Sequence, residues 1–176
     1  AGVVTVPQVD FKANPIRVER TLAREYREEV DWSELAHQPD YASIQTAAGS
    51  ALELAEVFVA TCQYDALDRP TRVTLPDGTV VVPRYDEGNA LVSLRAQIRG
   101  QGEFFPFLKD QRYDAKGQKQ FAHHGNDVLT RFFYDPATFR LTNLLVHREG
   151  DEAETQALQN IFYTYDPAGN ITQVRD

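Results

Sequence analysis

Histidine and aspartate are the residues in this sequence whose types and spacing could do chemistry. His123 and His124 form the only adjacent histidine pair, and Asp127 follows nearby. Imidazole and carboxylate both bind Zn²⁺ in proteins, but such a site needs a third and a fourth ligand of suitable geometry. Adjacent side chains of a strand point to opposite faces, so His123 and His124 would not share one ion. The pattern therefore favours solvated turn histidines, and we predict no metal site.

Aspartate recurs in a regular context, because it follows a tyrosine five times. The pairs are Tyr64-Asp65, Tyr85-Asp86, Tyr113-Asp114, Tyr134-Asp135 and Tyr165-Asp166. Carboxylates could bind Ca²⁺, but the residue spacing of an EF-hand loop is absent. An aspartate in a turn can instead accept hydrogen bonds from backbone N–H groups two residues further on. Such capping explains all five aspartates, so the sequence predicts structural turns without a bound cofactor.

Nucleophilic catalysis has no recognisable motif in the chain. None of the serines lies in a Gly-x-Ser-x-Gly context, and no glycine-rich loop that could cradle a phosphate is present. The serines are Ser33, Ser43, Ser50 and Ser93. We therefore expect no catalytic residue and no enzymatic activity.

A repeated strand–turn–strand unit must position the Tyr-Asp pairs, which lie 21, 28, 21 and 31 residues apart. A recurrence of this kind indicates a repeat architecture. The tyrosine ends the incoming strand and can stack on its neighbours along the sheet. After the aspartate, glycine supplies a positive φ and asparagine tolerates it nearly as well. The candidates for that role are Gly88, Asn89, Gly117, Gly169 and Asn170.

From residue 56 onward, extended segments alternate with turns. Strands are expected at 72–75, 80–82, 120–122, 128–134, 141–146, 160–165 and 171–174. Asp77-Gly78 is a strong hairpin signal between the strands 72–75 and 80–82. An acidic loop at 149–155 separates the strands 141–146 and 160–165. The insertion at 99–110 is expected to be a longer loop whose Phe104-Phe105-Pro106-Phe107 is tucked against the sheet.

The first 63 residues form a degenerate repeat and a connector. When residues from Val9 onward are aligned with Tyr165–Ile171, Asp10 and Asn14 occupy the positions of the second residue, aspartate, and the sixth residue, asparagine. They therefore indicate a degenerate copy of the same turn. Either a short polar strand or a surface helix fits the highly charged residues 17–29, and a strand that continues from the turn is favoured. A short helix could begin at 31–35 with Asp31 or Ser33 as N-cap, and 37–50 is expected to be a loop.

These patterns predict an all-β fold in which antiparallel hairpins form a curved sheet. At most one or two short helices are expected, between residues 20 and 55. The degenerate repeat and connector would occupy 1–63, and the repeat region 64–176, as one continuous structural unit. The chain lacks methionine, even at position 1, which indicates an excerpt from a larger protein.

Composition excludes several classes of function. The formal net charge of -8 at pH 7 argues against non-specific binding to nucleic acid. No apolar run approaches the length of a membrane span, and no secretory signal is visible. A single cysteine, Cys62, excludes an internal disulfide.

Taken together, the Tyr-Asp units resemble the YD or RHS repeats of Rhs effectors, teneurins and the B and C components of insecticidal Tc toxins. The resemblance is greatest to Tc-toxin-like proteins that combine an SpvB-like region with RHS repeats. The phrases that carry it occur in the same order: Asp10–Asn14, Asp31–Ser33, Leu75–Thr79, Tyr113–Gln118, Tyr134–Pro136 and Phe139–Thr142. It is strong over 64–176 and weaker before.

The resemblance implies a structural role, as a wall segment of a hollow β-shell that encapsulates and shields a C-terminal toxin domain before delivery. Its partners would be the remainder of the shell, the enclosed toxin domain and other toxin-complex components, and it would be secreted or exported from a bacterium. Asp166-Pro167-Ala168-Gly169 resembles the family's DPxG motif, but Asn170-Ile171 follows, so it is expected to be an ordinary repeat turn. An alternative remains open: a carbohydrate- or protein-binding β module that uses surface aromatics.

Overall fold

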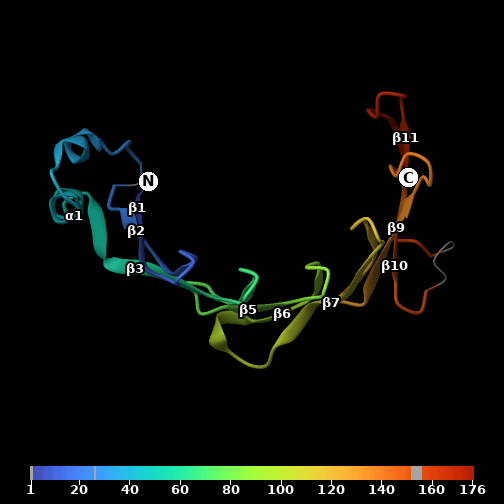
Figure 1. The fold of residues 1–176 in the computed structure, drawn as a ribbon, viewed down its shortest axis with the longest axis horizontal. Coiled ribbons are helices and arrows are strands. Elements are labelled where there is room, and N and C mark those ends of the chain that lie inside the picture. The colour runs from blue at the N-terminus through green and yellow to red at the C-terminus, as the bar shows by residue number, and fades with distance from the viewer. Residues whose placement is uncertain (1, 26, 152–155) are drawn as a thin grey trace. The chain divides into compact units, whose positions relative to one another are not determined.

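Twelve strands dominate the computed structural model, which describes residues 2–25, 27–151 and 156–176 (Figure 1). They form a sheet in which the spatial order of the strands is their order in the sequence. Each pair of neighbours whose register is resolved is antiparallel. The predicted all-β class is therefore confirmed. By their internal contacts the residues divide into two compact units, Ala1–Val80 and Val81–Asp176.

The first unit contains four strands and two short helices. Its strands are β1 (Gly2–Val9), β2 (Pro15–Ala23), β3 (Leu52–Tyr64) and β4 (Pro70–Thr74). The 3₁₀ helix η1 (Ser33–His37) and the α-helix α1 (Tyr41–Gly49) lie in the connection between β2 and β3. The degenerate copy of the repeat turn predicted at Asp10 joins β1 to β2. The expected boundary at residues 63 and 64 lies at the end of β3 and stays a prediction.

Two local expectations for this connection were wrong. Residues 41–49 form α1 where a loop was expected, because the Asp40 carboxylate caps the helix by accepting from the Ser43 N–H at 2.8 Å. In η1 the N-cap is Trp32 and not Asp31 or Ser33, although the Asp31 carboxylate accepts from the Ser33 N–H at 2.9 Å. No helix in the described part of the chain is long and apolar enough to cross a membrane.

The second unit contains the remaining strands, whose alternation with turns follows the expected pattern. They are β5 (Val80–Tyr85), β6 (Leu91–Gln97), β7 (Phe105–Tyr113), β8 (Lys119–His124), β9 (Val128–Tyr134), β10 (Leu141–Arg148), β11 (Gln159–Tyr165) and β12 (Ile171–Arg175). The short 3₁₀ helix η2 (Ile98–Gly100) lies between β6 and β7. Of the predicted acidic loop at 149–155, residues 152–155 lie outside the described residues.

The expectation for the insertion at 99–110 was wrong. Strand β7 begins at Phe105, which pairs with Ala96 of β6, so the second half of the insertion is strand and 98–104 connects the two strands. Phe105 and Phe107 are 58% and 51% exposed, because alternate residues of an open sheet face solvent. They are therefore not tucked against the sheet.

Burial in this sheet is shallow. The buried apolar side chains of the described residues are small in most cases: Ala23, Ala48, Leu52, Val80, Ala96, Ala122 and Leu145. No large side chain among the described residues is fully buried. Within each unit the sheet is therefore stabilised by its backbone hydrogen bonds and cross-strand side-chain pairs, more than by a packed interior.

Candidate functional site: the aspartate turns and their tyrosines

Six turns begin at an aspartate, and we call them the aspartate turns: Asp10, Asp65, Asp86, Asp114, Asp135 and Asp166. Five of them share one backbone design, which also occurs without a leading aspartate in the turn Leu75–Thr79. In the Asp114 turn, the Asp114 N–H donates to the Gln118 carbonyl at 2.9 Å, and the Gly117 N–H donates back to the Asp114 carbonyl at 3.0 Å. The same two bonds recur, with the same spacing, at Asp10, Asp65, Asp86 and Asp166. The Asp135 turn is one residue longer and closes between Asp135 and Arg140 at 2.9 Å.

The aspartate carboxylates cap these turns from within. Oδ1 of Asp114 accepts from the N–H groups of Lys116 and Gln118 at 2.8 and 2.9 Å. Oδ1 of Asp166 accepts from those of Gly169 and Asn170 at 2.7 and 2.9 Å. Corresponding bonds occur at Asp10, Asp65, Asp86 and Asp135. Each carboxylate therefore satisfies backbone donors that the tight turn would otherwise leave unpaired.

A residue with a positive φ lies three positions after the aspartate of each turn, or four positions after it in the Asp135 turn, as a type I turn with a bulge requires. In the Asp114 and Asp166 turns it is Gly117 (φ 80°) and Gly169 (φ 101°). At the Asp86 turn it is Asn89, with φ 70°, and not Gly88. Asn170 likewise does not adopt a positive φ; its side chain donates to Oδ2 of Asp166 at 2.9 Å. Of the candidates for this role, Gly88 and Asn170 were therefore wrong.

At four of the six aspartate turns, the tyrosine before the turn connects it to a preceding turn. Tyr165 pairs with Ile171 of β12, while its hydroxyl donates to the carbonyl of Leu141, the first residue of β10, at 2.7 Å. The same bond joins Tyr134 to Lys119 at 2.9 Å. In each case the acceptor is the first strand residue after the preceding aspartate turn. A single tyrosine thus ties together three consecutive strands.

Two further tyrosines make the same bond. The Tyr113 hydroxyl donates to the Leu91 carbonyl at 2.9 Å, and the Tyr64 hydroxyl donates to the Pro15 carbonyl at 3.2 Å. Burial raises the pKa of Tyr134, and the Asp114 carboxylate adds to the effect, so this hydroxyl keeps its proton near neutral pH. We call these four bonds the tyrosine ladder. Sequence reasoning missed them, since it expected the rings only to stack.

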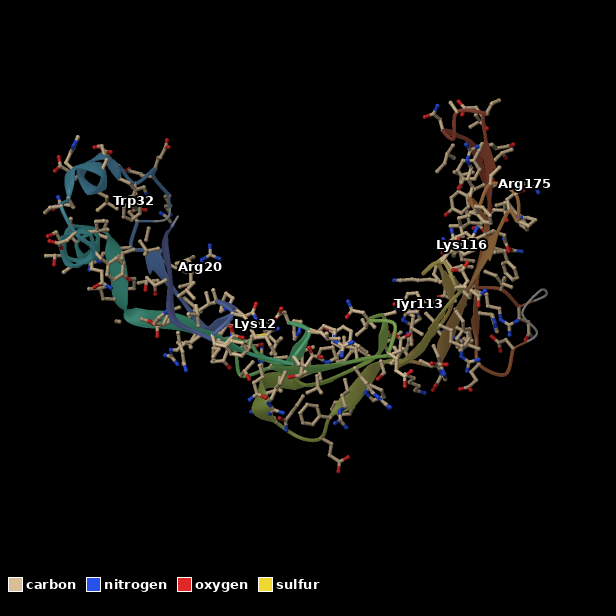
Figure 2. All side chains as sticks on the ribbon, viewed as in Figure 1. Lys12, Arg20, Trp32, Tyr113, Lys116 and Arg175 are labelled. Atoms are coloured by element: carbon tan, nitrogen blue, oxygen red, sulfur yellow. The ribbon has the colours of Figure 1, made fainter. Side chains whose placement is uncertain are left out.

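Polar side chains also connect neighbouring turns directly. In the first unit the Lys12 ammonium donates to the Ala66 carbonyl at 2.8 Å and pairs with Asp68 at 3.0 Å (Figure 2). In the second unit the Arg140 guanidinium donates to the carbonyls of Asp166 and Pro167 at 2.9 and 3.3 Å. In each unit, two neighbouring aspartate turns are therefore held to one another, and each turn is closed internally.

Hydrogen bonding favours the ionised form of several aspartates. The side chain of Asn170, followed by its backbone N–H, lowers the pKa of Asp166, and the Thr138 backbone N–H does the same at Asp135. At Asp65, desolvation is the largest influence and raises the pKa. The hydrogen bonds from Arg69 and Leu67 outweigh it, so the pKa is lowered. These carboxylates are therefore charged acceptors in the folded protein.

The two histidines lie on different sides of β8. His123 Nε2 lies 3.4 Å from the Asp127 carboxylate, whereas His124 Nε2 lies 3.3 Å from the Thr130 hydroxyl. The arrangement of the aspartate turns, the tyrosine ladder and these histidines supports a structural role for the turns.

The chain resembles parts of known toxin subunits. No protein-family model matches it. Toxin subunit YenC1 of Yersinia entomophaga is 30% identical over 138 residues, which are 78% of this chain and 14% of that protein. Toxin subunit YenC2 of the same organism is 27% identical over 175 residues, which are 99% of this chain and 17% of that protein. The chain thus spans less than a fifth of either relative.

Solved structures share this fold. A crystal structure of TcdB2-TccC3 superposes with a TM-score of 0.82 at 26% identity over 99% of this chain and 8% of that one. A Photorhabdus luminescens Tc holotoxin pore gives the same TM-score and identity, over 7% of its chain. The chain is therefore a homologue of a segment of the Tc toxin subunits, with the fold of their RHS repeats.

Proposed function

We propose that this chain is a wall segment of an RHS-repeat shell that encloses a toxin domain and shields it from solvent and protease until delivery. Two observations support this function. The homologues are toxin subunits several times longer than this chain, and the strands follow one another through the sheet in sequence order. A sheet built in this way lengthens by adding hairpins, so it suits a wall.

The observation that carries the proposal is the shallow burial of the sheet. Phe105 and Phe107 of β7 are 58% and 51% exposed, and Phe133 of β9 is 45% exposed. Large apolar side chains left open on a sheet mark surfaces that another element covers. In a shell, further hairpins and the enclosed chain provide that cover.

In this proposal the segment works as a barrier and contributes no catalytic group. Its partners are the rest of the shell, the enclosed toxin domain and other components of the toxin complex. The protein acts after export from a bacterium. The alternative of a glycan- or protein-binding module is not favoured, because the similar proteins are toxin subunits and complexes.

Limited proteolysis of the parent protein tests the proposal. The parent reading frame is expressed with its downstream domain, and trypsin digestion of that domain is followed by mass spectrometry. We expect protection in the wild type and cleavage in Gly125→Ala, whose added Cβ would lie 1.6 Å from the Pro106 carbonyl oxygen. Gly49→Ala is the matched control, because its Cβ meets only Leu54 at 3.7 Å.

Equal cleavage of the downstream domain in the wild-type protein and in isolation would refute the shell. Binding to a glycan array separates the two functions. Saturable binding that disappears when exposed Phe105 and Phe107 are replaced by serine would favour the binding module instead.

A further inference from the structure

Three side chains from separate segments meet at the far end of β8. His123 is the penultimate residue of β8, Asp127 belongs to the turn into β9, and Glu149 directly follows β10. His123 Nε2 lies 3.4 Å from Oδ1 of Asp127 and 3.6 Å from Oε2 of Glu149. All three ligand atoms lie within 4.8 Å of one another.

The backbone holds these residues in place. The Glu149 N–H donates to the Asp127 carbonyl at 2.7 Å, so the two carboxylates approach from adjoining segments. Asp127 has a φ of 61°, and its N–H donates to the His124 carbonyl at 3.1 Å, which closes the turn. The His123 side chain is only 17% exposed, whereas the two carboxylates are 56% and 57% exposed. The result is a half-open site between the ends of neighbouring strands.

We propose that His123, Asp127 and Glu149 form a binding site for a divalent transition-metal ion of the Zn²⁺ type. Ligand atoms at about 2.0–2.1 Å from a tetrahedral Zn²⁺ lie roughly 3.4 Å apart from one another. The two measured separations from His123 match that value within a few tenths of an ångström. One imidazole and two carboxylates suit Zn²⁺ better than Ca²⁺ or Mg²⁺, which prefer oxygen alone. The fourth position is open to water.

Lys109 already places a positive charge at this site. Its ammonium contacts Oδ1 of Asp127, the same oxygen that lies 3.4 Å from His123 Nε2. A cation is thus already accommodated beside this carboxylate. An incoming metal ion displaces Lys109, whose side chain is one-third exposed and can turn into solvent. Lys109 is therefore a competitor of the ion, and its removal tightens binding.

The bound ion would link β8, the turn into β9 and the end of β10, at the end of the strands where the aspartate turns are absent. A metal ligated by residues of separate elements stabilises the folded state that brings them together. The end of β10 would thereby be fastened to the hairpin of β8 and β9.

Zn²⁺ titration of the untagged full chain, stripped beforehand with a chelator, tests the site. Calorimetry should give one ion per chain, and Co²⁺ should show the absorption of a tetrahedral site. His123→Ala and Glu149→Gln should each weaken binding by about tenfold or more. Even the loss of a residue that only hydrogen-bonds to a metal ligand weakens metal binding by that factor. His124→Ala is the control, because His124 lies against Thr130 and should leave binding unchanged. Circular dichroism verifies that each variant is folded.

Lys109→Met gives a second, independent readout. It should bind Zn²⁺ more tightly than the wild type, because no ammonium competes for Asp127. Absence of saturable binding would overturn the proposal. So would equal binding by His123→Ala, which indicates adventitious surface carboxylates, or weaker binding by Lys109→Met.

Discussion

The two ends of the strands are built on different principles. At one end lie the aspartate turns, in which the same backbone and carboxylate bonds recur from Asp10 to Asp166. At the opposite end the connections vary in length and structure. They include α1 and η1 between β2 and β3, η2 between β6 and β7, and a turn with a close backbone approach at Gly125. The turn Leu75–Thr79 between β4 and β5 is the one that repeats the backbone bonds of the aspartate turns among the described connections at this end.

This difference explains why the repeat has a variable spacing. The distance from Tyr85 to Tyr113 includes the connection 98–104, and that from Tyr134 to Tyr165 includes the connection 149–158. Both intervals exceed the 21 residues that separate Tyr113 from Tyr134, where the connection is only the turn His124–Asp127. Length thus varies at one end, while the aspartate turns and the tyrosine ladder keep the other end in register.

The largest expected effect lies at the opposite end, at Gly125. A Cβ there would lie 1.6 Å from the Pro106 carbonyl oxygen and 3.2 Å from Cα of Phe107, which are backbone atoms that cannot turn aside. Gly125→Ala should therefore lower the free energy of unfolding by roughly 3 kcal/mol, as for severe overpacking. Urea unfolding followed by circular dichroism measures the change.

Gly49→Ala is the control for that experiment. Its φ is ordinary and its Cβ meets Leu54 at 3.7 Å, so the variant should be as stable as the wild type or gain roughly 0.5 kcal/mol. An unchanged unfolding midpoint for Gly125→Ala would show that β7 does not approach the His124–Asp127 turn as closely as described.

At the end with the aspartate turns, loss of a cap should have a moderate effect. Asp114→Ala removes the acceptor of the Lys116 and Gln118 N–H groups and should destabilise the protein by about 1 kcal/mol, as the loss of a helix N-cap does. Asp114→Asn keeps a side-chain oxygen and should lose less. The unfolding midpoint in urea reports both.

The matched variant at the opposite end is Glu103→Ala. Glu103 is exposed and makes no hydrogen bond within the described part of the chain, so its loss should change stability by less than about 0.5 kcal/mol. If Glu103→Ala were as destabilising as Asp114→Ala, the contrast between the two ends would not hold.

The sequence predicted the aspartate turns from local rules, because each cap spans at most four residues. It did not predict the tyrosine ladder, since the acceptors of Tyr64 and Tyr134 lie 49 and 15 residues away in the chain. The choice of Asn89 over Gly88 follows from the register of the turn bonds, which composition alone does not specify.

Other errors have different causes. Asp40 is an ordinary N-cap signal, and the expectation of a loop after it gave too much weight to Pro39 and Gly49. Gly100, Gly102 and Pro106 favour a loop over 99–110, but β7 begins at Phe105 and includes Pro106. The phenylalanines do not need cover, because an open sheet leaves them exposed. The approach of Glu149 to His123 depends on the pairing of β8, β9 and β10, which no spacing in the sequence reveals.

A smaller effect is expected from a single rung of the tyrosine ladder. Tyr165→Phe removes the hydroxyl that donates to the Leu141 carbonyl at 2.7 Å, which should destabilise the protein by about 1 kcal/mol or less. Tyr163→Phe is the control, because the Tyr163 hydroxyl makes no hydrogen bond within the described residues. Equal unfolding midpoints for the two variants would mean that the ladder adds nothing to the turns.

The smallest expected effect is a dependence of stability on acid that arises from the aspartate turns. Hydrogen bonds from Asn170 and from Thr138 lower the pKa of Asp166 and of Asp135 in the folded protein. Unfolded aspartate titrates near about pH 3.9. The unfolded state therefore binds more protons as the pH falls below about 4, and the stability that these carboxylates contribute at neutral pH is lost there.

Asp166→Asn isolates that contribution, since the amide keeps an oxygen acceptor and does not titrate. Compared with the wild type, its urea midpoint should decline less between neutral pH and about pH 3, because one proton-linked group has been removed. Asp176→Asn near the same end of the chain is the control for a general change in charge. Identical acid profiles for Asp166→Asn and the wild type would mean that the carboxylate is bound no more tightly in the turn than in the unfolded chain. The repeated aspartate would then act through the shape of the turn alone, and its charge would be incidental.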